Sequence, residues 1–108
     1  MFQFGEVVLL EYPYTDLIGV KLRPAVVLKD THDSDFIIAR ATSQLRQTEY
    51  DVQIEDWKTA GLLKPSIIRV HKLTTLETKL VKRKMGILSE KDLDNLLACL
   101  KRLFEVIV

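Results

Sequence analysis

Two arginines and a threonine occur in or beside predicted strands, and their side chains together could hold a phosphate. Arg23 stands just before Pro24, and a strand tolerates proline only at its first position or at an edge. Thr42 ends one apolar run and Arg69 lies within another. A guanidinium offers a planar fork of donors to phosphate and can stabilise charge developing there. Taken alone, an arginine such as Arg23 is more often a surface residue paired to an acid.

The composition excludes several other chemistries. Two histidines and one cysteine cannot supply a zinc site, and the chain has no glycine-rich phosphate loop, so we expect no metal and no cofactor. A serine nucleophile would need a positioned base, and only His32, in a predicted turn, and His71 are available. RNA brings its own nucleophile, the 2′-hydroxyl. A site of arginine, threonine and one titratable group could therefore cleave RNA without a metal.

Five apolar, β-branched runs predict the strands that would position these residues. The runs are 6–12, 21–28, 36–42, 50–54 and 66–73. Residues 56–61 predict a single helical turn, with an acid that can cap it and a glycine that can end it. Residues 74–80 could continue the last strand or re-enter the sheet, and residues 81–85 form a short basic segment before a break at Gly86.

The C-terminal helix is the clearest predicted element. Ser89 can cap it, Asp92 follows in a position like that of a capping box, and apolar residues recur at spacings of three and four from Leu93 to Phe104. We expect about four turns, with an apolar face that includes Cys99 covering one side of the sheet. The order of elements predicts a compact, strongly bent antiparallel sheet or a small barrel closed by this helix.

Length and charge bound the remaining possibilities. The 108 residues predict one domain, 1–108. The net charge is only +1, but residues 64–84 hold seven Lys or Arg and one acid, a block that would suit a polyanion or simply line a solvated strand face. The lone cysteine suits a reducing compartment, and no signal peptide or membrane-spanning run is present. We therefore expect a cytoplasmic protein.

Five motifs occur in a fixed order along essentially the whole chain. They are GEVV at 5–8, LRPAVVL at 22–28, ATSQ at 41–44, LLKPSIIRV at 62–70 and LTTL at 73–76, followed by the leucine-rich helix. In this order they resemble the PemK/MazF-like toxins of type II toxin-antitoxin systems. The resemblance implies a small SH3-like barrel of five or more short strands closed by a helix. It also implies a homodimer that cleaves single-stranded RNA without a metal and leaves a cyclic phosphate, and an antitoxin partner whose tail occupies the RNA groove.

The resemblance also implies roles for individual residues. Arg23 matches the family's strand-two arginine and Thr42 its strand-three threonine, the usual catalytic pair, and Arg69 matches an arginine that some members use as acid and phosphate clamp. Many members carry an acid two positions later, where this chain has His71. Our hypothesis is that His71 shuttles a proton in its place, the alternative being an idle strand histidine. The expected RNA contacts are Lys21, Ser43, Gln44, Asp16 and Lys72.

The loop before Arg23, residues 15–19, lacks the usual family pattern, so the target sequence cannot be transferred. Tyr14 and Trp57 could stack on bases or belong to the core or its rim. Five basic residues could contact the RNA backbone: Lys72, Lys79, Lys82, Arg83 and Lys84. Two other functions stay open. One is a regulatory or decoy barrel that binds RNA or an antitoxin without cutting, and the other is a dimerisation module.

Overall fold

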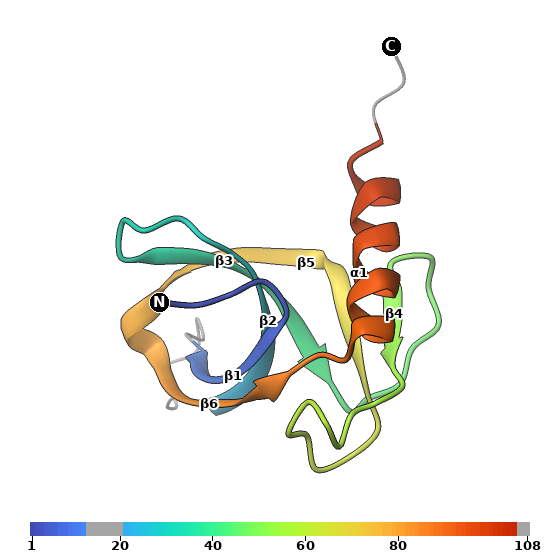
Figure 1. Cartoon of the computed structure of the whole chain (residues 1–108), viewed down its shortest axis with the longest axis horizontal. Coiled ribbons are helices and arrows are strands. Elements are labelled where there is room, and N and C mark those ends of the chain that lie inside the picture. Colours follow the sequence, from blue (N-terminus) through green and yellow to red (C-terminus); the bar gives the residue numbers. More distant parts are fainter. Residues whose placement is uncertain (13–20, 106–108) are drawn as a thin grey trace.

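The computed structural model describes residues 1–12 and 21–105. Its strands form one antiparallel sheet in the order β4-β5-β3-β2-β1-β6. The elements are β1 (Glu6–Tyr12), β2 (Lys21–Asp30), β3 (Asp35–Thr42), β4 (Asp51–Ile54), β5 (Ser66–Glu77), the 3-10 helix η1 (Thr78–Leu80), β6 (Val81–Ile87) and α1 (Glu90–Leu103). The sheet curls on itself and α1 stands beside β4 (Figure 1). The predicted class is confirmed, although hydrogen bonds do not close the sheet into a full barrel.

Both faces of the curled sheet are buried. The inner core consists of Val8, Leu10, Ala25, Val27, Phe36 and Ile38. The outer core, on the other face, includes Val7, Val26, Ala39, Ile68, Val70, Leu96 and Cys99. Successive strand residues point to opposite faces, so a strand buried on both sides is apolar at every position. This explains the continuous run that follows Pro24.

A turn that ends at Gly61 follows β4. Residues 56–61 form hydrogen-bonded turns, and the Ala60 N–H donates to the carbonyl of Asp56 at 3.1 Å, the bond that closes the predicted single helical turn. Gly61 adopts φ +82°, and its N–H donates to the carbonyl of Lys58 at 3.0 Å, while the Leu62 N–H donates to the carbonyl of Trp57 at 3.0 Å. This bond pair is the Schellman arrangement, which favours glycine in the left-handed position. The predicted role of the glycine is thus confirmed.

The same turn lies against β6. A Cβ added at Gly61 would overlap the backbone carbonyl of Met85, and one added at Gly86 would lie 2.7 Å from the carbonyl carbon and oxygen of Ala60. The prediction that the basic segment breaks at Gly86 is wrong, because β6 continues through it to Ile87. Gly86 is needed for close approach and not for a chain break. The turn after β4 therefore contacts the opposite edge strand, where no hydrogen-bonded ladder exists.

A buried carboxylate joins α1 to the end of β4. The Ser89 hydroxyl caps the helix by accepting from the Asp92 N–H at 3.3 Å. Asp92 is fully buried, and its carboxylate accepts from the N–H groups of Glu55 and Asp56 at 3.0 Å each. The predicted capping position is confirmed. The backbone N–H of Asp56 donates to this carboxylate, and no capping bond from the Asp56 side chain is found among the described residues. The N-terminus of α1 is thereby fixed to the sheet.

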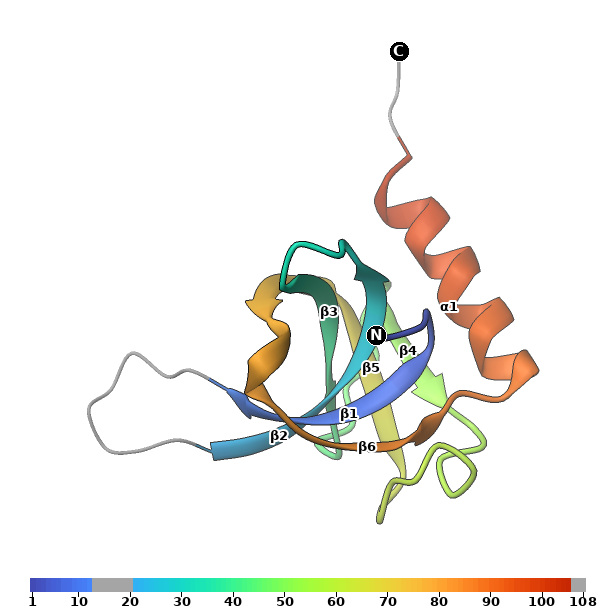
Figure 2. The same cartoon turned by 60° about the vertical axis from the view of Figure 1, so that its left-hand side comes forward.

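The apolar face of α1 is narrower than its sequence predicts. Leu96 and Cys99 are fully buried, and burial raises the pKa of the Cys99 thiol. Leu97 and Phe104, however, are 44% and 62% exposed. Figure 2 shows α1 standing to one side of the curled sheet, near β4. No helix in residues 1–12 and 21–105 is long and apolar enough to cross a membrane.

Candidate active site

Arg23 and Thr42 lie side by side near the ends of adjacent strands. Ala25 on β2 pairs with Arg40 on β3. Arg23 is two residues before Ala25 and Thr42 is two residues after Arg40, so the same antiparallel register places Arg23 opposite Thr42. Both side chains are half-buried. Together with Ser43 they line a pocket of about 270 Å³. The predicted catalytic pair is thus brought to one pocket by strand pairing.

The Thr42 hydroxyl is oriented by its own backbone. It accepts the N–H of Gln44 at 3.1 Å, a local bond typical of threonine at a strand end. Because the oxygen accepts this bond, its O–H can donate to an oxygen of a bound phosphate. Ser43 and Gln44 are exposed beside it.

The same pocket also has apolar lining residues. They are Leu9, Pro24, Ala41, Leu62, Leu63 and Met85, and Lys64 and Ser66 line it as well. Leu63 is 85% exposed, which is unusual for a leucine beside a pocket containing an arginine. The pocket therefore combines charged and apolar lining residues, an environment suited to a flat ring attached to a phosphate.

Arg69 is held by a buried carboxylate. Its Nε lies 3.0 Å from Oδ1 of Asp51, and the two side chains are 15% and 1% exposed. The other carboxylate oxygen accepts from the N–H and hydroxyl of Thr48 at 3.0 and 2.7 Å. Burial acts to raise the pKa of Asp51, but the bonds from Thr48 and Arg69 outweigh it and hold that pKa below its usual value. The guanidinium is thus fixed in one orientation.

Arg40, which the sequence analysis did not single out, lies directly opposite Arg69. The two are register partners on β3 and β5, so their side chains share one face of the sheet. Arg40 Nε is buried and has no hydrogen-bond partner among the described residues. Arg40 precedes Thr42 by two positions, so strand alternation alone could have placed it on the face of the predicted site.

His71 and Lys72 occupy an irregular part of β5. Arg40 pairs with Arg69 but the preceding residue, Ala39, pairs with Leu73, so residues 70–72 have no partner on β3. His71 Nδ1 is buried and, within residues 1–12 and 21–105, without a hydrogen-bond partner. Its ring centroid lies 6.2 Å from that of Tyr50. Neither His71 nor Lys72 lines the pocket of Arg23 and Thr42.

The sequence matches a family model over residues 3–104, and that family is the PemK-like, MazF-like toxins of type II toxin-antitoxin systems. The chain belongs to this toxin family. Members of the family are endoribonucleases. Among curated proteins, no sequence matches the chain.

Solved structures share the fold. A Mycobacterium tuberculosis toxin, MazF-mt6, is 18% identical, with a TM-score of 0.77 over 95% of this chain and 99% of that one. A mycobacterial endoribonuclease bound to its cognate antitoxin is 13% identical, with a TM-score of 0.77 over 100% and 99%. MazF in the MazE-MazF complex of Deinococcus radiodurans is 16% identical, with a TM-score of 0.74 over 93% and 92%. At these identities the likeness establishes the fold alone.

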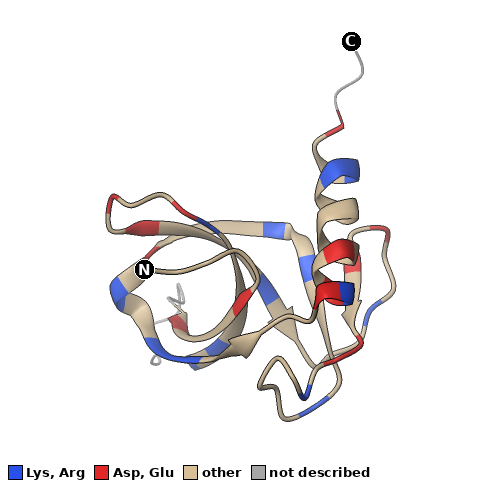
Figure 3. Cartoon of the chain, in the orientation of Figure 1, with Lys and Arg blue, Asp and Glu red and all other residues tan. Residues whose placement is uncertain are grey.

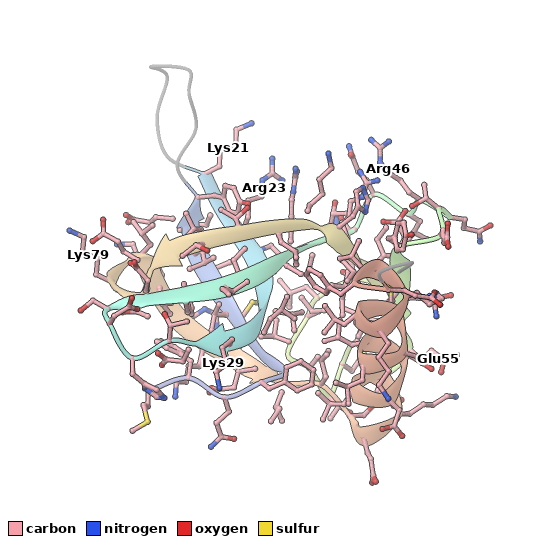
Figure 4. The ribbon with its side chains drawn as sticks, turned by 90° about the horizontal axis from the view of Figure 1, so that it is seen from above. Lys21, Arg23, Lys29, Arg46, Glu55 and Lys79 are labelled. Atoms are coloured by element: carbon pink, nitrogen blue, oxygen red, sulfur yellow. The ribbon has the colours of Figure 1, made fainter. Side chains whose placement is uncertain are left out.

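The other residues predicted to contact RNA in this toxin-family chain are scattered. Asp16 and Tyr14 lie outside the described residues. Trp57 is half-buried and packs against the outer core, which favours the core interpretation over base stacking. Lys21, at the start of β2, is exposed. Figure 4 shows Lys21 on the same side of the molecule as Arg23 and Arg46, with Lys29 on the opposite side.

Three of the five predicted basic contacts are engaged by acids of the chain. Lys79 lies 3.2 Å from Glu77, Lys82 2.6 Å from Glu11 and Lys84 3.4 Å from Glu6. Figure 3 shows the Lys and Arg of the η1 and β6 segment gathered on one side of the curled sheet. Within the described ranges, no three His, Cys, Asp or Glu side chains are grouped as metal ligands.

Proposed function

We propose that the chain is a metal-independent endoribonuclease that cleaves single-stranded RNA. The observation that carries this proposal is the meeting of Arg23 and Thr42 at one pocket, in a chain of the PemK-like, MazF-like family. A guanidinium and a hydroxyl aimed at one phosphate supply the donors that a phosphorane needs as its negative charge grows.

In the proposed reaction, the 2′-oxygen attacks the adjacent phosphorus and the bond from phosphorus to the 5′-oxygen breaks. The products are a 2′,3′-cyclic phosphate and a free 5′-hydroxyl. Arg23 and Thr42 hold the non-bridging oxygens. A base must take the proton of the 2′-hydroxyl, the role that we assign to His71, and the leaving 5′-oxygen must receive a proton, the role that we assign to Arg69.

The remaining proposed RNA contacts surround this centre. Lys21, Ser43, Gln44, Asp16 and Lys72 stay in that proposal. The apolar lining of the pocket supports it, since a base could lie there while its phosphate faces Arg23. Only a single strand can present its base in this way, because in a duplex the base is stacked and paired.

We also propose a cognate antitoxin and a second copy of the chain as partners, and action in the cytoplasm. The antitoxin complexes of the mycobacterial and Deinococcus proteins support the first partner. Exposed apolar side chains on α1 and at its C-terminal cap, Leu97 and Phe104, support a protein partner on the helix. Light scattering of the isolated chain measures whether it is a dimer.

The deciding experiment is cleavage of a long single-stranded RNA in the presence of EDTA, with the fragment ends mapped. We expect cuts at a short sequence by the wild type and a loss of about a hundredfold or more in Arg23→Ala and in Thr42→Ala. Lys29→Ala is the matched control, since Lys29 is exposed on the opposite side (Figure 4). A folded wild type that leaves the RNA intact would refute the proposal.

His71→Ala tests the proton shuttle in the same assay. We expect at least a tenfold loss of rate at neutral pH and the disappearance of one limb of the pH profile. Unchanged cleavage by this variant would show that His71 is idle.

A binding module without catalysis is the second candidate. Two observations favour it: Nε of Arg69 is already bonded to Asp51, and the family's acid is replaced by His71. This candidate predicts RNA or antitoxin binding that weakens in Arg23→Ala, with no cutting by any variant.

A further inference from the structure

Two arginines are register partners on the adjacent strands β3 and β5, and one carboxylate, on β4, lies on the other side of β5. Arg40 pairs with Arg69, and Arg69 pairs with Asp51 on β4. The only ion pair described for this trio joins Arg69 to Asp51. The trio therefore carries one uncompensated positive charge on a partly buried face. Like charges directly opposite each other destabilise a sheet, so this arrangement calls for an anion.

The polar atoms near this trio are also unsatisfied. Among the described residues, the buried side-chain nitrogens that lack a hydrogen-bond partner are Arg40 Nε and His71 Nδ1. His71 lies in the β5 irregularity that faces the step between Ala39 and Arg40. A buried donor without an acceptor carries a desolvation cost, and an oxygen-rich anion would remove it for Arg40.

The trio adjoins the proposed catalytic pair. Arg40 and Thr42 are two residues apart on β3 and share a face, which separates them by about 6.5 to 7 Å along the strand. Successive phosphates of a single strand of RNA have a comparable separation. Arg46, from the loop after β3, projects on the same side as Arg23 (Figure 4), so the surroundings favour a chain of negative charges over a single anion.

We propose that Arg40 binds the RNA phosphate next to the one held by Arg23 and Thr42, while its neighbour Arg69 serves the reacting phosphate. Asp51 is a positioning residue, which orients Arg69 without touching RNA. The proposal rests on RNA being the ligand of this site, but it does not require cleavage. A planar guanidinium can bind a phosphate through two donors, which lysine cannot reproduce.

The test is the binding of a single-stranded RNA in which every ribose carries 2′-fluorine, so that the attacking hydroxyl is absent. We expect Arg40→Gln to bind about tenfold more weakly and to reduce the slope of log affinity against log salt by about 0.7, the value of one phosphate contact to a single strand. Arg40→Lys should keep most of the slope but not the affinity. Lys29→Gln is the control and should change neither.

Thermal unfolding separates this role from a structural one. Arg40→Gln should unfold at the wild-type temperature or higher, because it removes the charge opposite Arg69. A lower unfolding temperature, or an unchanged affinity and slope, would overturn the proposal. The proposal would also be overturned if Arg40→Gln weakened the binding of a polyglutamate peptide but not the binding of RNA, since the site would then bind protein carboxylates.

The two proposals fail in different ways. If Arg40→Gln weakens the binding of 2′-fluoro RNA but the wild type leaves natural RNA uncut, the nuclease proposal is refuted and the proposal of a phosphate site stands. If the wild type and Arg40→Gln cut RNA equally well and bind it with the same salt slope, the phosphate site is refuted and the nuclease proposal stands. A wild type that binds no RNA would overturn both.

Discussion

Asp51 connects stability to the orientation of the candidate site. Its carboxylate is almost inaccessible and bonds both Arg69 and Thr48. Removing one partner of a buried ion pair leaves the other charge without compensation, which costs more than the pair itself contributes. Here the loss would leave the register partners Arg40 and Arg69 without the one carboxylate that is paired with either of them among the described residues.

We predict that Asp51→Asn lowers the free energy of unfolding at pH 7 by about 3 kcal/mol. The folded-state pKa of Asp51 is depressed, so its contribution is complete above the unfolded value of about 3.9 and is lost as the pH falls through the folded value. The variant should therefore lose less stability than the wild type on acidification below pH 4. Urea titrations at pH 7, 4 and 3 measure this.

Asp94→Asn is the control, since Asp94 is exposed on α1, and it should leave stability unchanged. Adding Arg40→Gln to Asp51→Asn should recover part of the loss, because the opposed charges are then reduced to one. Equal stability of Asp51→Asn and the wild type at pH 7 would contradict the structural role of the pair.

Residue types alone indicated Arg23 and Thr42 but could not reveal the trio. Arg23 stands beside a proline and Thr42 ends an apolar run, and both features are local. The expectation that Pro24 takes the first position of its strand or an edge is wrong, because β2 begins at Lys21 and lies between β3 and β1. The environment of Arg40 depends on which strand lies beside β3, and Asp51 reaches Arg69 only because β4 pairs with β5. Strand register is set by side chains far apart in sequence, so it cannot be read from one segment.

At the scale of elements, two glycines allow the turn after β4 to pack against β6, the opposite edge strand of the curled sheet. Gly61 has positive φ and lies against Met85, and Gly86 lies against Ala60. The sequence correctly indicated a turn ending at Gly61, because that signal is local. The sequence wrongly indicated a strand break at Gly86. Close backbone approach and chain breaking both favour glycine, and only the tertiary structure distinguishes them.

We predict that Gly61→Ala costs roughly 2–4 kcal/mol of folding free energy, from left-handed strain and from overlap with the Met85 carbonyl. The turn leads into Leu62 and Leu63, which line the candidate pocket, so RNA affinity should also fall. Chemical denaturation and binding of the 2′-fluoro RNA measure the two effects. Lys58→Ala, an exposed change in the same turn, should alter neither. A Gly61→Ala protein as stable as the wild type would show that the contact with Met85 does not require glycine at this position.

The basic strand β6 has a simpler explanation than RNA binding. It lies at one end of the sheet, where an exposed edge could pair with another chain, and charged side chains discourage such pairing. Lys82 and Lys84 face Glu11 and Glu6 of the neighbouring β1. Of the seven basic residues in the block 64–84, these two are therefore paired with acids of β1, while Lys79 and Arg69 are paired with Glu77 and Asp51.

At the scale of the whole molecule, charge is arranged by side and not by sequence block. Lys21, Arg23 and Arg46 project on one side, while Lys79 lies at one end of the curled sheet (Figure 4). Arg40 and Arg69 belong with the first set because they share a sheet face with Thr42, as the strand registers show. An RNA strand bound at the candidate pocket would thus meet cations contributed by β2, β3, β5 and the loop after β3.

We predict that two variants with the same net charge differ in their salt dependence of RNA binding. Lys21→Ala with Arg46→Ala should reduce the slope of log affinity against log salt by about 1.4, two contacts at about 0.7 each. Lys79→Ala with Lys82→Ala removes the same charge from residues already paired with acids and should change the slope little. Equal slopes for the two double variants would mean that RNA binding depends on net charge and not on the side that carries Arg23. The RNA-binding surface proposed for that side would then be refuted.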